Sequence, residues 1–139
     1  MNKLYILVAE DDEEDREIME IVFSKLTCPA KMVFVENGEQ LLAHLAAYGG
    51  AFEGLILTDL NMPRLNGKQV LKSLKEDTRY KHIPVVVFST SAWGEDVQIC
   101  YRAGASTFIS KPDNMEGWTD MLTNICSYWF RTALLPSQS

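Results

Sequence analysis

One aspartate, Asp59, stands where a strongly apolar stretch of the chain ends. The run 55–58 has the composition of a buried strand, and the polar turn after Asp59 contains Pro63 and Gly67. In open α/β sheets, the residues at the carboxyl ends of the strands line the crevice where ligands bind. A carboxylate in such a place can act as a nucleophile and form an aspartyl-phosphate. We therefore predict that Asp59 accepts a phosphoryl group.

A second group of acids follows the first apolar run and predicts a metal site. Glu10, Asp11 and Asp12 come directly after the run 3–9, and seven of the 19 acidic residues lie between Glu10 and Glu17. Crowded carboxylates repel one another and either keep a proton or bind a cation. An all-oxygen set of ligands suits Mg²⁺. The other four acids are expected in the first turns of a helix, where negative charge complements the helix dipole: Glu13, Glu14, Asp15 and Glu17.

Two more polar residues follow apolar runs later in the chain. Ser89 comes after the run 84–88, and Lys111 comes after the run 106–110. Phosphoryl transfer places negative charge on the equatorial oxygens, so positioning and charge neutralisation dominate its catalysis. Mg²⁺ and Lys111 would neutralise that charge, and Ser89 would donate a hydrogen bond to a phosphoryl oxygen. A serine alone after a strand usually forms a turn, so the prediction depends on the shared position of these residues.

Strand-like and helix-like segments alternate along the chain, and this order predicts how the polar residues meet. The apolar runs are 3–9, 31–35, 55–58, 84–88 and 106–110, and the segments with helical spacing are 14–26, 41–45, 68–76, 95–103 and 115–131. Such alternation predicts an α/β fold, (βα)5, with a doubly wound five-stranded parallel sheet covered on both faces. Right-handed crossovers put the carboxyl end of every strand at one edge. Glu10, Asp59, Ser89 and Lys111 should converge there.

Composition excludes several classes of function. The chain has 139 residues, 47% hydrophobic and 23% charged, as in an ordinary single globular domain. No apolar run approaches the ~20 residues of a membrane span, and acids follow the N-terminal run where a signal peptide would have its cleavage site. We expect a cytoplasmic protein with no membrane association. The net charge of −6 argues against binding to nucleic acid.

The three cysteines are expected to be buried or half-buried thiols. Cys28, Cys100 and Cys126 are odd in number, lie far apart and form no Cys-x-x-Cys pair. Free cysteine is among the most frequently buried residue types. We therefore predict neither a metal site nor a redox motif from them.

Taken together, these motifs resemble the receiver domain of two-component response regulators, over about residues 4 to 131. The resemblance rests on the following residues: Glu10-Asp11, Thr58-Asp59, Met62-Pro63, Gly67, the strand 84–89, Ala103-Gly104-Ala105 and Lys111-Pro112. It implies a flavodoxin-like sheet with strand order 2-1-3-4-5. It also implies Mg²⁺-dependent phosphoryl transfer from a histidine kinase to Asp59. Such a protein is not an enzyme in the usual sense, since it catalyses only its own phosphorylation and dephosphorylation.

The resemblance also implies which residues hold the metal. Asp59 and Asp11 would bind Mg²⁺ directly, and Glu10 would act through metal-bound water. Asn61 would offer its backbone carbonyl. Asp12 is an alternative to Asp11, although the length of the preceding strand favours Asp11.

On the phosphate side, the resemblance gives Lys111 as the partner of the phosphoryl group and Ser89 as the switching hydroxyl. A slip of one residue would choose Thr90 instead, but the spacing from Pro84 to Lys111 favours Ser89. Phe108 matches the aromatic switch position, which is often Tyr, and here has no hydroxyl.

The peptide bond after this lysine is a further expectation of the resemblance. The Lys111–Pro112 bond is expected to be cis, which would fix the direction of the lysine. Asp113 departs from the bulky apolar residue that is common after Lys-Pro in this family, and this departure bears on the choice of partner.

The surface that transmits the signal is less well defined. We expect residues 1–131 to form the receiver domain and residues 132–139 a short C-terminal tail, with no output domain. Candidate partner surfaces include Trp93, Tyr101 and the cluster around Trp129, which packs either on the body of the domain or on a second copy in a homodimer.

The expected partners are a sensor histidine kinase or a phosphotransfer protein, and an unknown downstream protein. The C-terminal pattern also looks like the single-domain regulators paired with bacterial phytochromes and related kinases.

Two other functions would need residues that the sequence does not have at the required positions. A Mg²⁺-dependent phosphohydrolase with an aspartyl-phosphate intermediate typically carries an acid two residues after the nucleophile, and Asn61 stands there. A flavin-binding electron carrier would need a glycine- and hydroxyl-rich phosphate loop after the first strand. The acids from Glu10 to Glu14 would repel a phosphate at that place.

Overall fold

Strands and helices alternate along the whole chain, as the apolar runs predict. A computed structural model describes residues 3–49, 51–90 and 93–136. The strands are β1 (Leu4–Ala9), β2 (Ala30–Val35), β3 (Gly54–Asp59), β4 (Val85–Ser89) and β5 (Thr107–Ser110). The helices are α1 (Glu13–Ser24), α2 (Gly38–Ala47), α3 (Gly67–Glu76), α4 (Gly94–Arg102), α5 (Met115–Ser127) and a π-helical turn, η1 (Tyr128–Thr132). Each predicted element is present, with bounds shifted by a few residues.

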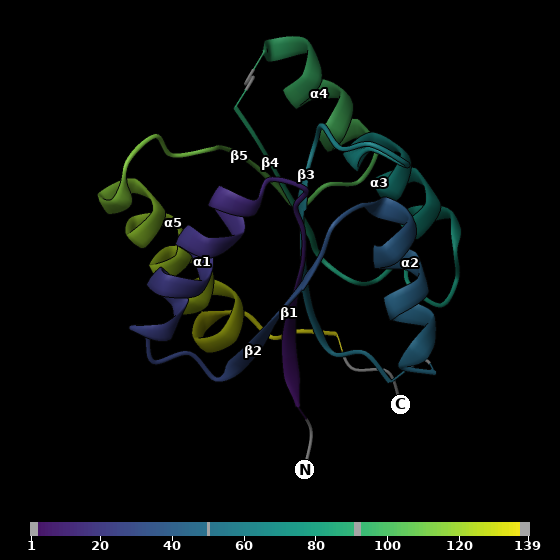
Figure 1. Ribbon diagram of the computed structural model, residues 1–139. Coiled ribbons are helices and arrows are strands. Elements are labelled where there is room, and N and C mark those ends of the chain that lie inside the picture. The colour runs from purple at the N-terminus through teal and green to yellow at the C-terminus, as the bar shows by residue number, and fades with distance from the viewer. Residues whose placement is uncertain (1–2, 50, 91–92, 137–139) are drawn as a thin grey trace.

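The five strands form one parallel sheet in the order β2-β1-β3-β4-β5, which confirms the predicted doubly wound, flavodoxin-like fold. Helices α1 and α5 cover one face, and α2, α3 and α4 lie on the other side (Figure 1). The register pairs Ala9 with Thr58, Asp59 with Phe88, and Ser89 with Ser110. The ends of the four strands β1, β3, β4 and β5 are therefore level.

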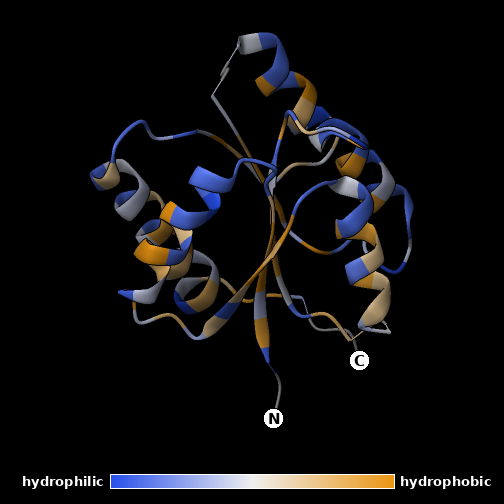
Figure 2. Cartoon of the chain, viewed as in Figure 1, coloured by the Kyte–Doolittle hydropathy of each residue, from blue (hydrophilic) through white to orange (hydrophobic). Residues whose placement is uncertain are grey.

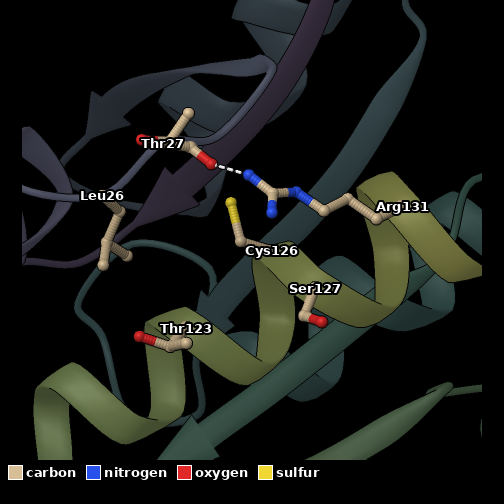
Figure 3. Close-up of a pocket in the computed structure, with 6 residues that line it drawn as sticks. All are labelled: Leu26, Thr27, Thr123, Cys126, Ser127 and Arg131. Carbon is tan, nitrogen blue, oxygen red and sulfur yellow. Dashed lines mark hydrogen bonds between the residues drawn. The ribbon is translucent and has the colours of Figure 1, made fainter.

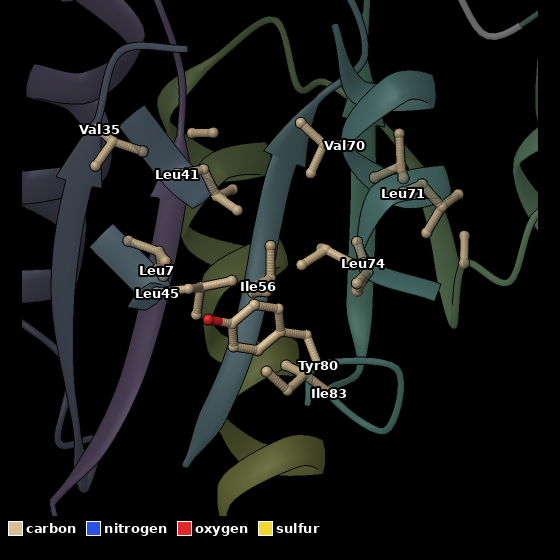
Figure 4. Close-up of a cluster of buried hydrophobic side chains, with 14 of the residues drawn as sticks. Leu7, Val35, Leu41, Leu45, Ile56, Val70, Leu71, Leu74, Tyr80 and Ile83 are labelled. Carbon is tan, nitrogen blue, oxygen red and sulfur yellow. The ribbon is translucent and has the colours of Figure 1, made fainter. Parts of the chain in front are cut away.

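Two apolar clusters separate the sheet from its two layers of helices. One contains Leu7, Ile56 and Val87 from the strands with Leu41 and Leu71 from α2 and α3 (Figure 4). The other packs α1 and α5 against the opposite face. Apolar residues follow the central strands, whereas loops and outer helix faces are mostly hydrophilic (Figure 2). Strands β3 and β4 are buried at every residue, as expected of central parallel strands.

The C-terminal helix differs from its prediction. A single helix was predicted from 115 to 131, but α5 ends at Ser127 and continues as the π-helical turn η1. The Thr132 hydroxyl donates to the carbonyl of Ser127, five residues earlier. Arg131 donates a hydrogen bond to the carbonyl of Thr27, so η1 is connected to the loop after α1 (Figure 3).

The prediction of three free thiols was wrong for two of the cysteines. Cys28 and Cys126 form a disulfide with a Cα–Cα distance of 5.9 Å, although 98 residues separate them. Their proximity depends on how α5 packs against the loop before β2, which spacing along the chain does not reveal. Cys100 is a buried free thiol, as predicted. Within the described ranges, no helix is long and apolar enough to cross a membrane.

Candidate functional site

Four residues predicted from strand ends converge at one edge of the sheet. Asp59 ends β3 and Ser89 ends β4, while Glu10 follows β1 and Lys111 follows β5. Because the strands are parallel and level, these side chains meet although a hundred residues of chain separate Glu10 from Lys111. Three of the four, Glu10, Asp59 and Ser89, are buried.

The acids at this edge form a group that could hold a metal ion. One carboxylate oxygen from each of Glu10, Asp11 and Asp59 lies within 4.8 Å of the others. Glu10 and Asp59 are buried, but Asp11 is exposed, so the group opens to solvent on the Asp11 side. Carboxylate oxygens open to water are the ligands that a hard cation such as Mg²⁺ takes. The donor set therefore fits such an ion.

The alternative between Asp11 and Asp12 can be examined directly. Asp12 is the N-cap of α1, and its carboxylate accepts hydrogen bonds from the backbone amides of Glu14 and Asp15 at 2.9 and 3.3 Å. An acid used in this way satisfies the exposed amides of the first helical turn. Asp11 is not the N-cap of α1, and its carboxylate belongs to the acid group.

Glu10 is an unusual acid because it is fully buried. Its Oε1 atom has no hydrogen-bond partner among the described residues, and its close contact is the ion pair with Lys111 at 2.5 Å. Burial, with help from the neighbouring Asp59, raises the pKa of Glu10 to about 8, against the opposing effect of Lys111. A buried carboxylate favours either a proton or a neighbouring cation, and Lys111 is the neighbouring cation in this structure.

Lys111 is surrounded by carboxylates. Its Nζ atom lies 3.0 Å from Oδ2 of Asp59 and 3.0 Å from Oδ2 of Asp15, in addition to Glu10. Burial disfavours the charged ammonium, but the close contacts with Glu10 and Asp15 outweigh this and raise the pKa of Lys111. The lysine is therefore charged and points at the carboxylate predicted to accept the phosphoryl group.

The Lys111–Pro112 bond does not have the expected geometry. No cis peptide bond occurs among residues 3–49, 51–90 and 93–136, so this bond is trans and the prediction of a cis bond was wrong for this structure. The direction of the lysine is set by other contacts. Its backbone amide donates to the carbonyl of Ser89 at 2.8 Å, its ammonium lies 5.0 Å from the centre of the Phe88 ring, and three carboxylates hold it.

Asn61 connects Asp59 with Ser89. The backbone amide of Asn61 donates to Oδ1 of Asp59 at 3.2 Å, and its side-chain amide donates to the Ser89 hydroxyl at 3.4 Å. Ser89 is fully buried, whereas Thr90 is exposed. This burial and contact favour Ser89 over Thr90 as the hydroxyl that faces the site.

Gly67 packs closely against the backbone of Asp59 and Leu60. The amide of Gly67, the first residue of α3, donates to the carbonyl of Leu60 at 2.8 Å. A β-carbon on Gly67 would lie 2.5 Å from the backbone oxygen of Asp59. The loop between them turns through Arg64 and Leu65, both with positive φ. The start of α3 therefore packs on the backbone that carries the acceptor.

The predicted switch and partner residues lie away from this cluster. Phe108 is half-buried on β5, and its backbone amide donates to the Tyr101 hydroxyl at 3.1 Å. Tyr101 is 48% exposed and Trp93, the N-cap residue of α4, is 73% exposed. Trp129 is half-buried and packs against the cluster under α5.

Sequence reasoning missed one member of the site. Asp15 is in the first turn of α1, as predicted, but its carboxylate also contacts Lys111. The available signal was the place of Asp15 in the acidic run that begins at Glu10. Among seven neighbouring acids, that signal was too weak to select it.

Fold and site together define a class of small signalling domain, with an acid group, an acceptor aspartate, a hydroxyl and a lysine at the carboxyl edge of a (βα)5 sheet. The family model described as "Response regulator receiver domain" matches residues 6–123. The chain belongs to the response regulator receiver family of two-component systems.

Several known proteins resemble the chain over nearly its full length. Response regulator Rcp1 of Synechocystis is 31% identical, over 95% of this chain and 92% of Rcp1. The phosphorylated cyanobacterial phytochrome response regulator RcpA is 33% identical, with a TM-score of 0.88, covering 99% of this chain and all of RcpA. RPA3017, a response regulator in red light signalling of R. palustris, is 33% identical, with a TM-score of 0.85 and coverage of 96% and 98%.

A solved structure of Rcp1 carries Mn²⁺. It is 30% identical to this chain, with a TM-score of 0.84, and the match covers 96% of this chain and 99% of that one. A divalent cation is thus known in a relative of this fold.

Proposed function

We propose that the chain is a phosphoacceptor response regulator in which Asp59 takes a phosphoryl group from a phosphohistidine donor with the help of Mg²⁺. The observation that carries the proposal is the contact between Lys111 and Asp59 beside the acid group. The ammonium lies 3.0 Å from the Asp59 carboxylate. One oxygen each of Glu10 and Asp11 lies within 4.8 Å of an Asp59 oxygen. A cation and a candidate metal site next to the same carboxylate suit a reaction dominated by charge neutralisation.

Each residue of the site has a role in this proposal. Asp11 and Asp59 would hold the metal directly, with the Asn61 carbonyl, and Glu10 would act through water. The metal would supply charge neutralisation on the phosphoryl oxygens. Lys111 would pair with one of these oxygens and Ser89 would donate its hydroxyl to another.

Phosphorylation would then change a surface of the protein. Movement of Ser89 toward the phosphoryl group would break its contact with Asn61 and leave room for Phe108 to turn inward. Such a step shifts a pre-existing equilibrium between two states rather than building a new one. The face around α4 and β5, with Trp93 and Tyr101, is the proposed site of readout, and Trp129 beyond α5 is a further candidate contact.

Membership of the receiver family supports a proposal for the partners and the place of action. We infer a cytoplasmic protein that receives its phosphoryl group from a sensor histidine kinase or a phosphotransfer protein and acts on a downstream protein. The likeness to RcpA and RPA3017 supports a phytochrome-type kinase. In this proposal residues 1–131 form the receiver domain and residues 132–139 form a short tail, of which 137–139 lie outside the described residues. The proposal is compatible with a homodimer.

A phosphohydrolase remains the alternative function, and Asn61 argues against it. Its side chain cannot act as the acid or base that a hydrolase needs next to its nucleophile, and it donates to Ser89 instead. Turnover of a released substrate is therefore not proposed.

One experiment separates the two functions. The protein is incubated with Mg²⁺ and acetyl phosphate, and its mass is measured before and after hydroxylamine. A hydroxylamine-labile phosphoryl group on the wild type, absent from Asp59→Asn and from a sample with chelator, supports the switch. Repeated turnover of small phosphoesters would overturn it in favour of the hydrolase.

A further inference from the structure

The Lys111 ammonium already contacts three carboxyl groups in this structure, and it donates hydrogen bonds to two of them, Asp15 and Asp59. The side chain is 6% exposed and forms ion pairs with Glu10 at 2.5 Å and with Asp15 and Asp59 at 3.0 Å each. A lysine ammonium has three N–H donors and no acceptor. A phosphoryl group on Asp59 must therefore share a cation that already has three partners.

Asp15 differs from the other two partners of the lysine. Glu10 and Asp59 belong to the acid group that could bind a metal, and Asp15 does not. A cation held by that group would occupy oxygens of Glu10 and Asp59, but it would leave the Asp15 carboxylate on the lysine. Asp15 comes from α1, and its side chain is 21% exposed.

We propose that Asp15 is a positioning residue that competes with the phosphoryl group for the Lys111 ammonium. Its carboxylate thereby weakens the interaction between Lys111 and the phosphoryl group. This proposal rests on the proposed function. Opposite charges at 3 Å attract strongly in a poorly solvated site, and the positive charge that Asp15 neutralises is lost to a neighbouring anion. Asp15 and the phosphoryl group also repel each other directly. Asp15 thereby sets how firmly Lys111 responds to phosphorylation.

The test compares two substitutions in the same helical turn. Asp15→Asn and Glu14→Gln each remove one negative charge from the first turn of α1, but Glu14 is exposed and forms no ion pair in the described part of the chain. Beryllofluoride binding is measured in saturating Mg²⁺. We expect Asp15→Asn to bind it about fivefold more tightly than the wild type, and Glu14→Gln to change by less than about twofold, because solvent and salt screen exposed charges.

A second readout needs neither metal nor phosphate. Reductive methylation of Lys111 in the metal-free protein is followed by mass spectrometry, with the exposed Lys72 as an internal standard. Loss of the Asp15 carboxylate should speed methylation of Lys111 several-fold, because the amine loses one of the partners that occupy it. Asp15→Glu, which keeps the charge, should restore both the slow methylation and the wild-type affinity for beryllofluoride.

Several results would overturn the proposal. Asp15→Asn that binds beryllofluoride as Glu14→Gln does, or more weakly than the wild type, would show that Asp15 does not compete with the phosphoryl group. Unchanged methylation would show that the contact with Lys111 has no effect in solution. A wild-type protein that binds no beryllofluoride while its Lys111 methylation still depends on Asp15 would instead count against the proposed function.

Discussion

Glu10 combines a carboxylate with an environment that opposes its charge. It is fully buried, and Asp59 lies next to it. Lys111 offsets part of this effect, yet the pKa of Glu10 remains raised from 4.5 to about 8. The raised pKa means that the folded protein holds the Glu10 proton more tightly than the unfolded chain does, so the stability that Glu10 contributes at low pH is lost as the pH rises from about 4.5 toward 8. A metal ion reverses this preference because it binds the ionised form.

The first prediction is therefore that Mg²⁺ displaces a proton from Glu10. Near pH 7 binding should release about one proton, and the release should vanish above about pH 9, so the affinity rises with pH between these values. Titration calorimetry in two buffers with different ionisation enthalpies measures the number of protons. Glu10→Gln should abolish the release. The same release in that variant would assign the proton to another group.

At the scale of elements, the start of α3 supports the acceptor loop. Asn66 caps α3 through its side chain, and Gln69 completes a reciprocal capping box by bonding back to the Asn66 amide. These bonds fix the first turn of the helix. Gly67 can then lie against the backbone of Asp59 and Leu60, where no side chain fits.

Two glycine substitutions test this support. Gly67→Ala should lower the free energy of unfolding by about 1–3 kcal/mol and weaken Mg²⁺ binding, because the backbone of Asp59 must move to admit the new methyl group. Gly94→Ala, at the start of α4, should be neutral or stabilising, since among the described residues nothing lies within 4 Å of its β-carbon. Chemical denaturation with and without Mg²⁺ measures both effects. Equal results for the two variants would contradict the role of Gly67.

At the scale of the whole molecule, two contacts connect the C-terminal helix with the N-terminal part of the chain, and neither involves a residue of the acid group. The Cys28–Cys126 disulfide and the Arg131–Thr27 hydrogen bond both join α5 and η1 to the loop between α1 and β2. A disulfide across such a long stretch of chain stabilises a fold mainly by restricting the unfolded chain. The state of this bond depends on the redox conditions around the protein.

Reduction should therefore destabilise the oxidised protein. A dithiol reductant is expected to lower the free energy of unfolding by about 2–4 kcal/mol and to lower the melting temperature. Cys28→Ser, which cannot form the bond, should melt at the same temperature with or without reductant. A wild-type protein that is insensitive to reductant would show that the two sulfurs are thiols in solution.

The sequence was sufficient for the fold and for most of the residues at the sheet edge, for one physical reason. Strand ends are visible in the sequence as the point where an apolar run stops, and parallel topology brings such ends together, as with Asp59 and Lys111. Asp15, the trans bond at Pro112 and the pairing of Cys28 with Cys126 were not predicted. The contact of Asp15 with Lys111 and the pairing of the two cysteines depend on distances between elements, which neither spacing nor periodicity specifies. The cis bond was expected only from the resemblance to the family.

The Tyr101 hydroxyl bears on whether another chain can add a strand to the edge of the sheet. β5 is the last strand of the sheet, and a strand at an edge offers free backbone amides to which another chain can add a strand. Tyr101 reaches over from α4 and occupies the amide of Phe108. The half-exposed Tyr101 side chain thus occupies one of the backbone donors on the edge strand of the sheet. A shift of α4 in the proposed readout that broke this hydrogen bond would expose the Phe108 amide to strand addition.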